Sequence, residues 1–147
     1  MEIIKLMERK VTMKHFVNIS ALVLILLVGT GIAEENKVYK AAVDKDGIQR
    51  VNIQAGSYYF DPNYIVVKVN VPVEITIKKE AEIIAHGFVM NAPEAGIDVK
   101  ETLSSKPKEI KFTPTKIGKY LFYCDKKFLF SESHREKGMV GMIEVTE

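Results

Sequence analysis

The sequence has very little of the chemistry that cross-links and metal clusters require. Its 147 residues include one cysteine and three histidines, and tryptophan is absent. A single cysteine excludes an intramolecular disulfide framework and a structural zinc site built from several cysteines. The formal net charge is only +2, from 21 basic and 19 acidic residues, which gives no electrostatic case for a nucleic-acid partner.

Common signatures of catalysis are missing as well. The sequence contains no nucleophile elbow, no recognisable pair of catalytic carboxylates and no second cluster of metal-binding residues. We therefore predict that the protein is not an enzyme. Its length and its apolar content of 47% suit a single domain with its own core.

One long uncharged run lies near the N-terminus. Residues 16–33 carry no charge over 18 positions and follow four basic residues. This layout is typical of a secretory signal peptide, and the small residues Gly31 and Ala33 predict cleavage after Ala33. An uncleaved membrane anchor is the alternative, because a spanning helix needs about 20 apolar residues. Either way, we expect an exported domain over residues 34–147, in the periplasm or another extracytoplasmic space.

Removal of residues 1–33 would change the chemical inventory of the protein. The remaining chain has 17 basic and 17 acidic residues, so its net charge is zero. The loss of His15 leaves only His86 and His134 beside Cys124. These three side chains supply all of the imidazole and thiol groups.

The exported part is predicted to form short β-strands. Apolar and polar residues alternate between residues 48 and 78, as at Val73, Ile75 and Ile77. We expect residues 91–106 to form a loop that crosses between sheets. Further strands are predicted over residues 83–90, 108–113, 118–124 and 139–146. Many short strands indicate an all-β fold, a Greek-key antiparallel β-sandwich.

Residues 125–133 do not fit the strand pattern. They include Phe128, Leu129 and Phe130 in a row. One interpretation is that these side chains pack into the end of the core, and the segment is long enough for a turn or two of helix. The other is an exposed apolar patch that docks a partner.

The remaining thiol and imidazoles suggest a copper site. A thiolate and two imidazoles, with a weak thioether on the axis, form the ligand set that selects copper in electron-transfer sites. Cys124 ends a predicted strand, and His134 and Met139 follow on the next loop. His86 lies well upstream at another strand end. Each of these four residues could also have only a structural role, for example Cys124 as a small buried side chain or His134 as a surface histidine.

Three segments around these residues have a recognisable pattern. Residues 118–124 read Gly-Lys-Tyr-Leu-Phe-Tyr-Cys, and residues 86–88 read His-Gly-Phe. In residues 134–141, four residues separate a histidine from Met-Val-Gly. They resemble the corresponding segments of the cupredoxins, the small blue copper proteins such as plastocyanin. The His-Gly-Phe segment is also similar to the copper domain of cytochrome c oxidase subunit II.

This resemblance implies a cupredoxin-like sandwich that binds one copper ion. His86, Cys124 and His134 would be the equatorial ligands and Met139 the axial ligand. The copper would cycle between Cu(I) and Cu(II), and the protein would carry single electrons between redox partners such as a membrane oxidase or a cytochrome. A membrane is an expected partner only if residues 1–33 are retained.

One departure from the family pattern leaves alternatives open. Nine residues separate Cys124 from His134, more than in typical blue copper proteins. The insertion leaves open a red or green centre, or one with an open coordination position. Phe128 stands where oxidase subunit II carries a second cysteine, so a two-copper site is not expected. A copper carrier or chaperone for a membrane oxidase is a further alternative, although such proteins favour Met- and His-rich tracts.

Overall fold

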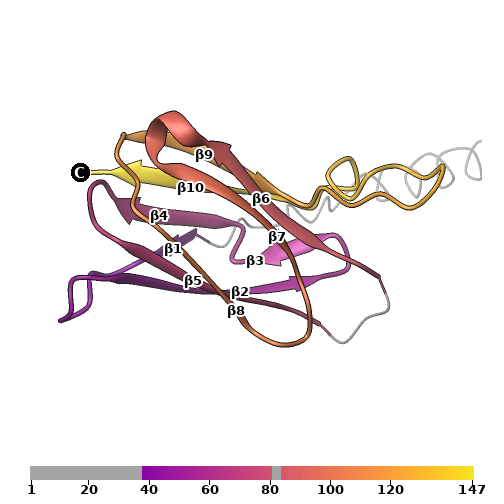
Figure 1. Cartoon of the computed structure of the whole chain (residues 1–147), viewed down its shortest axis with the longest axis horizontal. Helices are drawn as coiled ribbons and strands as arrows, with labels where there is room; N and C mark the ends of the chain where they lie inside the picture. The colour runs from indigo at the N-terminus through magenta and orange to yellow at the C-terminus, as the bar shows by residue number, and fades with distance from the viewer. Residues whose placement is uncertain (1–37, 81–83) are drawn as a thin grey trace, which may run out of the picture. The chain divides into compact units, whose positions relative to one another are not determined.

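The computed structural model describes residues 38–80 and 84–147. The predicted signal peptide or membrane anchor over residues 1–33 lies outside the described residues. In the described part, two β-sheets pack face to face, with one short 3-10 helix (Figure 1). No helix within these residues is long and apolar enough to cross a membrane.

The sandwich consists of a six-stranded and a four-stranded sheet. In spatial order, the first contains β1 (Val38–Lys40), β4 (Tyr64–Lys68), β10 (Val140–Thr146), β9 (Gly118–Tyr123), β6 (Gly87–Ala92) and β7 (Ile97–Thr102). The second contains β3 (Tyr59–Asp61), β2 (Gln49–Gly56), β5 (Val73–Lys79) and β8 (Lys108–Phe112). The 3-10 helix η1 (Pro93–Ala95) lies between β6 and β7.

The alternation seen in the sequence places one face of each strand in the core. In β5, Val73, Ile75 and Ile77 are buried, while the residues between them are partly or fully exposed. The same period of two holds in β2 and β10. Because β-branched side chains have few rotamers and pack well on a pleated surface, these residues favour strands.

Three phenylalanines from both sheets meet in the core. The ring centroid of Phe60 in β3 lies 5.7 Å from that of Phe88 in β6 and 5.2 Å from that of Phe122 in β9. All three side chains are buried. Gly141 in the neighbouring strand β10 has no space for a side chain, because a Cβ atom would overlap the Phe122 ring. Aromatic packing thus gives a physical reason for the glycine in the Met-Val-Gly segment.

The all-β sandwich is confirmed, but its strand pairing is not purely antiparallel as predicted. β4 pairs in parallel with both β1 and β10, and β2 pairs in parallel with β5, so both sheets are mixed. The predicted loop over residues 91–106 is also wrong, because it contains the end of β6, η1 and β7. The alternation of side chains does not show whether a neighbouring strand runs parallel or antiparallel. That direction depends on how the connections cross the sandwich.

The helical alternative for residues 125–133 is wrong. These residues form turns around an isolated antiparallel bridge between Lys127 and Ser133. The connection projects beyond the ends of β9 and β10 (Figure 1, gold). The exposed fractions of Phe128, Leu129 and Phe130 are 71%, 73% and 102%. The three side chains therefore do not reach the core, because the bridge closes the segment into a loop that points away from it.

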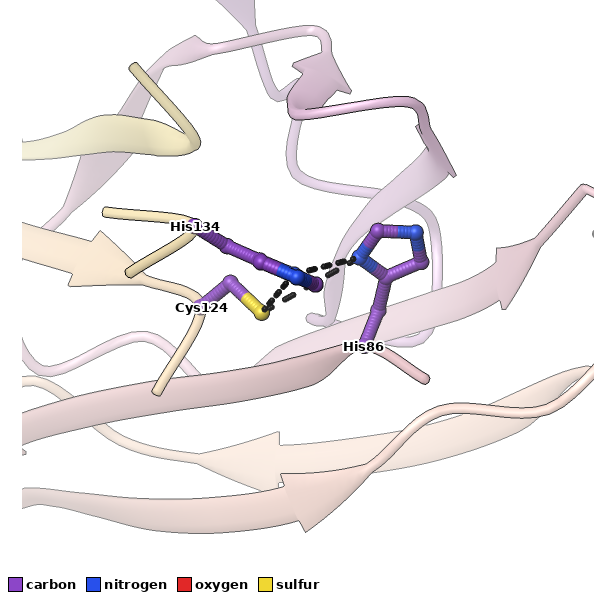
Figure 2. A group of neighbouring side chains, drawn as sticks. All are labelled: His86, Cys124 and His134. Atoms are coloured by element: carbon purple, nitrogen blue, oxygen red, sulfur yellow. Dashed lines mark hydrogen bonds between the residues drawn. The ribbon is translucent and has the colours of Figure 1, made fainter. Parts of the chain in front are cut away.

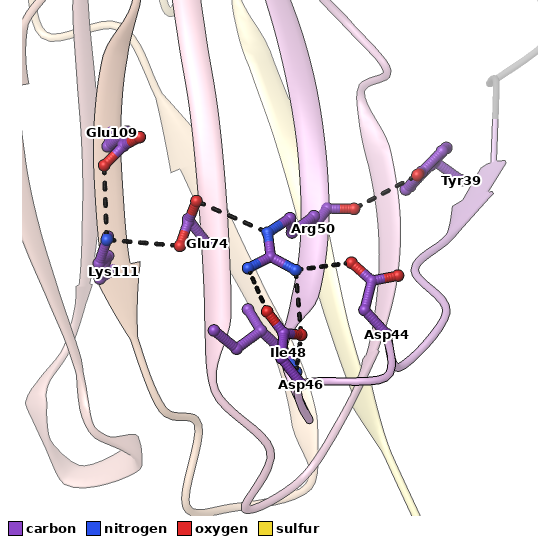
Figure 3. A network of polar contacts seen from close by, with 8 residues as sticks. All are labelled: Tyr39, Asp44, Asp46, Ile48, Arg50, Glu74, Glu109 and Lys111. Carbon is purple, nitrogen blue, oxygen red and sulfur yellow. Dashed lines mark hydrogen bonds and ion pairs between the residues drawn. The ribbon is translucent and has the colours of Figure 1, made fainter.

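A charged network joins the turn before β2 to the outer face of the four-stranded sheet (Figure 3). Arg50 lies 2.7 Å from carboxylate oxygens of Asp44 and Asp46 and 3.7 Å from Glu74 of β5. Lys111 of β8 extends the network and lies 3.4 Å from Glu74. The hydrogen bond with Asp46 is the largest of the influences that raise the pKa of Arg50. Because Arg50, Asp44 and Asp46 are exposed, the network positions the turn and adds little stability.

Candidate metal centre

The strand order brings three strand ends together at one end of the sandwich. β6 and β10 are the two neighbours of β9, and both run antiparallel to it. The beginning of β6, the end of β9 and the beginning of β10 therefore lie side by side. His86 directly precedes β6, and Cys124 directly follows β9. His134 and Met139 lie on the connection from β9 to β10.

Three of the predicted ligand side chains converge at this end (Figure 2). The Sγ atom of Cys124 lies 3.4 Å from Nδ1 of His134 and 4.0 Å from Nδ1 of His86. The two Nδ1 atoms are 3.2 Å apart. All three residues are buried. Residues that are up to 48 positions apart in the sequence thus form one compact cluster.

The spacing of the three donor atoms suits a metal ion. They form a triangle with edges of 3.2, 3.4 and 4.0 Å. The circumradius of this triangle is about 2.1 Å, and zinc bonds to imidazole nitrogen and thiolate sulfur, which set the scale for such metals, are about 2.0–2.3 Å long. His86, Cys124 and His134 are therefore spaced so that their donor atoms could hold one metal ion together.

Met139 is held between two of the predicted ligands by its backbone. Its carbonyl accepts a hydrogen bond from the N–H of Cys124 at 3.1 Å, and its N–H donates to the carbonyl of His134 at 2.9 Å. Its side chain is fully buried, whereas Met142 is only partly buried. These bonds place the backbone of Met139 beside two of the predicted ligands, and a thioether is a weak donor of the kind that suits an axial position in copper sites.

A backbone group not predicted from the sequence contacts the sulfur atom. The N–H of Gly87 donates a hydrogen bond to Sγ of Cys124 at 3.2 Å. Burial has the largest effect on the thiol and raises the pKa of Cys124, while the backbone hydrogen bonds from Gly87 and Lys126 oppose this rise. The one feature of the sequence that could have indicated this contact is the glycine directly after His86.

Tyr58 packs against His134 and was also not predicted. The two rings meet edge to face, with centroids 4.9 Å apart. Tyr58 lies between β2 and β3 with φ of 67°, a left-handed conformation that is rare for a bulky residue. Nζ of Lys137 lies 4.5 Å from the centroid of the Tyr58 ring and 3.3 Å from its hydroxyl. Because this contact joins two distant loops, no local pattern in the sequence reveals it.

The surroundings of His134 favour its neutral form. Burial is the largest cause and lowers the pKa of His134 below its ordinary value of 6.5, and the nearby His86 and Lys137 lower it further. Neutral imidazole is the form that binds metal ions. This environment therefore favours the protonation state of His134 that metal binding requires.

We expect the metal-free protein to be most stable between pH 6.5 and 9.0, the ordinary pKa values of histidine and cysteine. The folded-state pKa of His134 is lowered, so the unfolded chain binds this proton more readily and stability falls as the pH drops below 6.5. The folded-state pKa of Cys124 is raised, so the unfolded chain releases this proton more readily and stability falls above pH 9.0. Urea unfolding across this pH range measures both slopes. Cys124→Ser should flatten the alkaline slope and His134→Gln the acidic one, and slopes unaltered by these substitutions would contradict the assignment.

We expect Tyr58→Ala to raise the pKa of His134 in the metal-free protein toward its ordinary value. The substitution removes a ring that shields the imidazole from water, and desolvation is the main cause of the lowered pKa. NMR titration of the histidine ring protons measures the change. Tyr58→Phe keeps the ring and should have a smaller effect, and Tyr39→Ala, which alters an exposed tyrosine of β1, serves as the control. An equal rise in Tyr39→Ala would show that Tyr58 has no specific effect.

Comparisons with known proteins agree with this fold. The chain matches the family model of the cupredoxin-like domain over residues 19–140. The metal-binding domain of the Streptococcus pneumoniae Cu(I)-exporting P-type ATPase CopA, solved with Cu(I), is 24% identical, with a TM-score of 0.58 over 76% of this chain and 98% of that domain. Auracyanin from Roseiflexus castenholzii is 16% identical, with a TM-score of 0.55 over 73% of this chain and 99% of auracyanin.

A third similar structure is a domain of a cytochrome oxidase subunit. The periplasmic domain of cytochrome oxidase subunit II from Bradyrhizobium japonicum is 16% identical, with a TM-score of 0.50 over 67% of this chain and 83% of that domain. A search of curated proteins finds no match. At these identities the solved structures show a common fold. Because the family model spans most of the sequence, including His86, Cys124 and His134, the chain belongs to the cupredoxin-like family.

Proposed function

We propose that the protein binds one copper ion and carries single electrons between redox partners. The observation that carries this proposal is the buried cluster of one thiol and two imidazoles, whose donor atoms are spaced for a common metal ion. Thiolate, imidazole and thioether together select copper. We assign His86, Cys124 and His134 as equatorial ligands and Met139 as the weak axial ligand.

The chain supports this function by holding its ligands still. A bound copper ion would supply the Cu(I)/Cu(II) couple. His86 and Cys124 are attached to the ends of two paired strands, and the backbone N–H of His134 donates to the carbonyl of Lys126 at 2.9 Å. The hydrogen bond from Gly87 to the sulfur keeps Cys124 oriented and partly offsets its negative charge. These side chains then need to move little when a bound copper ion changes between Cu(I) and Cu(II).

Titration of the metal-free protein with Cu(II) tests the copper site. We expect an intense thiolate-to-copper charge-transfer band that saturates at one copper per chain, followed by reversible one-electron reduction in voltammetry. The position of the band distinguishes a blue site from the red or green site that the long connection between Cys124 and His134 leaves open. A colourless complex, or saturation at two copper ions, would contradict the proposal.

Copper transport is the second candidate function. It is supported by the similarity to a metal-binding domain that was solved with Cu(I). The small number of methionines in the exported part, Met90, Met139 and Met142, favours electron transfer instead. Two rates separate the candidates: a shuttle exchanges electrons rapidly with a small redox reagent and releases Cu(I) slowly to a chelator. A carrier would exchange electrons slowly and release Cu(I) rapidly to the chelator.

We also propose that the domain works outside the cytoplasm without enzymatic activity of its own. Support comes from the uncharged run over residues 16–33 and its small residues before position 34. Among the described residues, His86, Cys124 and His134 form a single group of clustered metal-binding side chains. Redox proteins such as a membrane oxidase or a cytochrome are the proposed partners. Cell fractionation, together with N-terminal sequencing, tests the location and the cleavage after Ala33.

A further inference from the structure

The insertion between Cys124 and His134 ends in an exposed apolar tip. We call residues 126–134 the finger and residues 128–130 its tip. The antiparallel bridge between Lys127 and Ser133 closes the finger below the tip. The least exposed of the three tip side chains, Phe128, is still 71% exposed. Three large apolar side chains in succession thus face away from the core of their own domain.

The size of the tip favours a lipid bilayer over a protein as its partner. Three such side chains offer roughly 500 Å² of apolar surface. One partner of a specific protein complex usually buries about 800 Å². A bilayer has no such requirement, because its interfacial region accepts any apolar side chain that reaches it. Large exposed apolar patches mark protein or membrane contacts, and a short narrow tip fits the second.

The charges around the tip suit the surface of an anionic bilayer. Lys126 and Lys127 directly precede the tip, and lysine can lie along an apolar surface while its ammonium group stays in water. Phospholipid phosphates attract such groups. Arg135 and Lys137 lie further along the chain and pack over Tyr123 and Tyr58.

The acidic residues of this region do not crowd the tip. Three are present, Asp125, Glu132 and Glu136. Asp125 lies 3.6 Å from Lys126 at the base of the finger. Glu136 accepts hydrogen bonds from the backbone N–H and the hydroxyl of Ser133, at 2.6 and 2.7 Å. Only Glu132 lies close to the tip in sequence without such a contact, and two lysines oppose it on the other side.

The chain enters the sandwich at the same end as the finger. β1 and β10 both run parallel to β4, and Val38 stands level with Met142, near the beginning of β10. The first described strand therefore begins at the end of the sandwich that carries the finger.

We propose that the tip inserts into the interfacial region of a lipid bilayer, with the exposed Lys127 at the level of the phosphates. Entry of the tip into the bilayer needs no copper. It orients the end of the sandwich with His86, Cys124 and His134 toward the membrane. This orientation would present the copper site to a redox partner in the same membrane, and this last step rests on the proposed function.

The absence of tryptophan permits a direct test with a single fluorophore. Phe130→Trp places an indole at the tip of the full-length, metal-free protein, which is then incorporated into vesicles of anionic and zwitterionic phospholipid with brominated acyl chains. We expect a blue-shifted emission and at least a two-fold quenching by the brominated lipid. The matched control is Ile117→Trp, which replaces another exposed apolar residue, 57% exposed, at the opposite end of β9 from Cys124. Its emission should remain that of an indole in water.

Equal quenching of the two variants, or quenching of neither, would overturn the proposal. A second measurement separates insertion from simple proximity: Lys126→Glu combined with Lys127→Glu should reduce the quenching of Phe130→Trp in anionic vesicles and leave it nearly unchanged in zwitterionic ones. Because these readouts need no metal, failure of insertion leaves the copper proposal standing. Failure of copper binding likewise leaves insertion standing.

Discussion

Replacing Cys124 by serine is expected to abolish the visible charge-transfer band of the Cu(II)-loaded protein. The chain has one cysteine, so no other thiol can take its place. A serine hydroxyl is a harder and far less acidic donor than a thiol, and it gives copper no sulfur-based absorption. Serine is close to cysteine in size, so the buried site should still form. Absorption spectra during Cu(II) titration measure the loss.

Substitutions of the other three predicted ligands should affect copper binding and the charge-transfer band to different degrees. His86→Ala and His134→Ala each remove one equatorial imidazole and should weaken copper binding strongly, with loss or collapse of the band. Met139→Leu keeps an apolar side chain of similar size, so copper should stay bound while the band shifts, as expected for a weak axial ligand. Survival of the full band in Cys124→Ser would rule out the assigned copper site.

Replacing Phe122 by alanine is expected to reduce the free energy of unfolding of the metal-free protein by about 4 kcal/mol, within the usual range for a buried phenylalanine. Phe122 is fully buried and packs against Phe60 and Phe88, which come from opposite sheets. Its removal leaves a cavity between the two sheets, and this cavity cannot collapse without moving strands. Urea unfolding monitored by circular dichroism measures the change.

Phe130→Ala is the matched control for this substitution. The same atoms are removed, but Phe130 is fully exposed and contributes no core packing. Its effect should stay within about 0.5 kcal/mol. Similar losses in the two variants would mean that the phenylalanine cluster does not stabilise the sandwich as described. Phe122 also lies two residues before Cys124, so copper binding by Phe122→Ala would show how far the metal site depends on the core behind it.

Local patterns in the sequence were sufficient to predict the class of the fold and the strands that carry its buried faces. Alternation at Val73, Ile75 and Ile77 predicted strands with one buried face, and the structure confirms this burial. The pattern was reliable because the side chains of a strand point to opposite faces in turn, whatever its neighbours are. The position of Cys124 at a strand end followed from the same period.

Other features depended on contacts between distant parts of the chain. The parallel pairing of β4 with β10 joins residues about 80 positions apart in the sequence, and nothing local specifies it. Strand β7 was missed because its polar residues face solvent at the edge of a sheet. The packing of Tyr58 on His134 joins two loops that have no common motif.

By itself, the sequence determined that the chain after its N-terminal apolar run forms a β-sandwich with a single possible set of one thiol and two imidazoles, because composition and side-chain period are local properties. Only the tertiary structure decided that His86 comes within 4.0 Å of the sulfur of Cys124, and that the nine residues after Cys124 lead outward instead of into the core. Both outcomes depend on strand order: the pairing of β6, β9 and β10 brings their ends together, and the filled core between the sheets leaves no space there for three more large side chains.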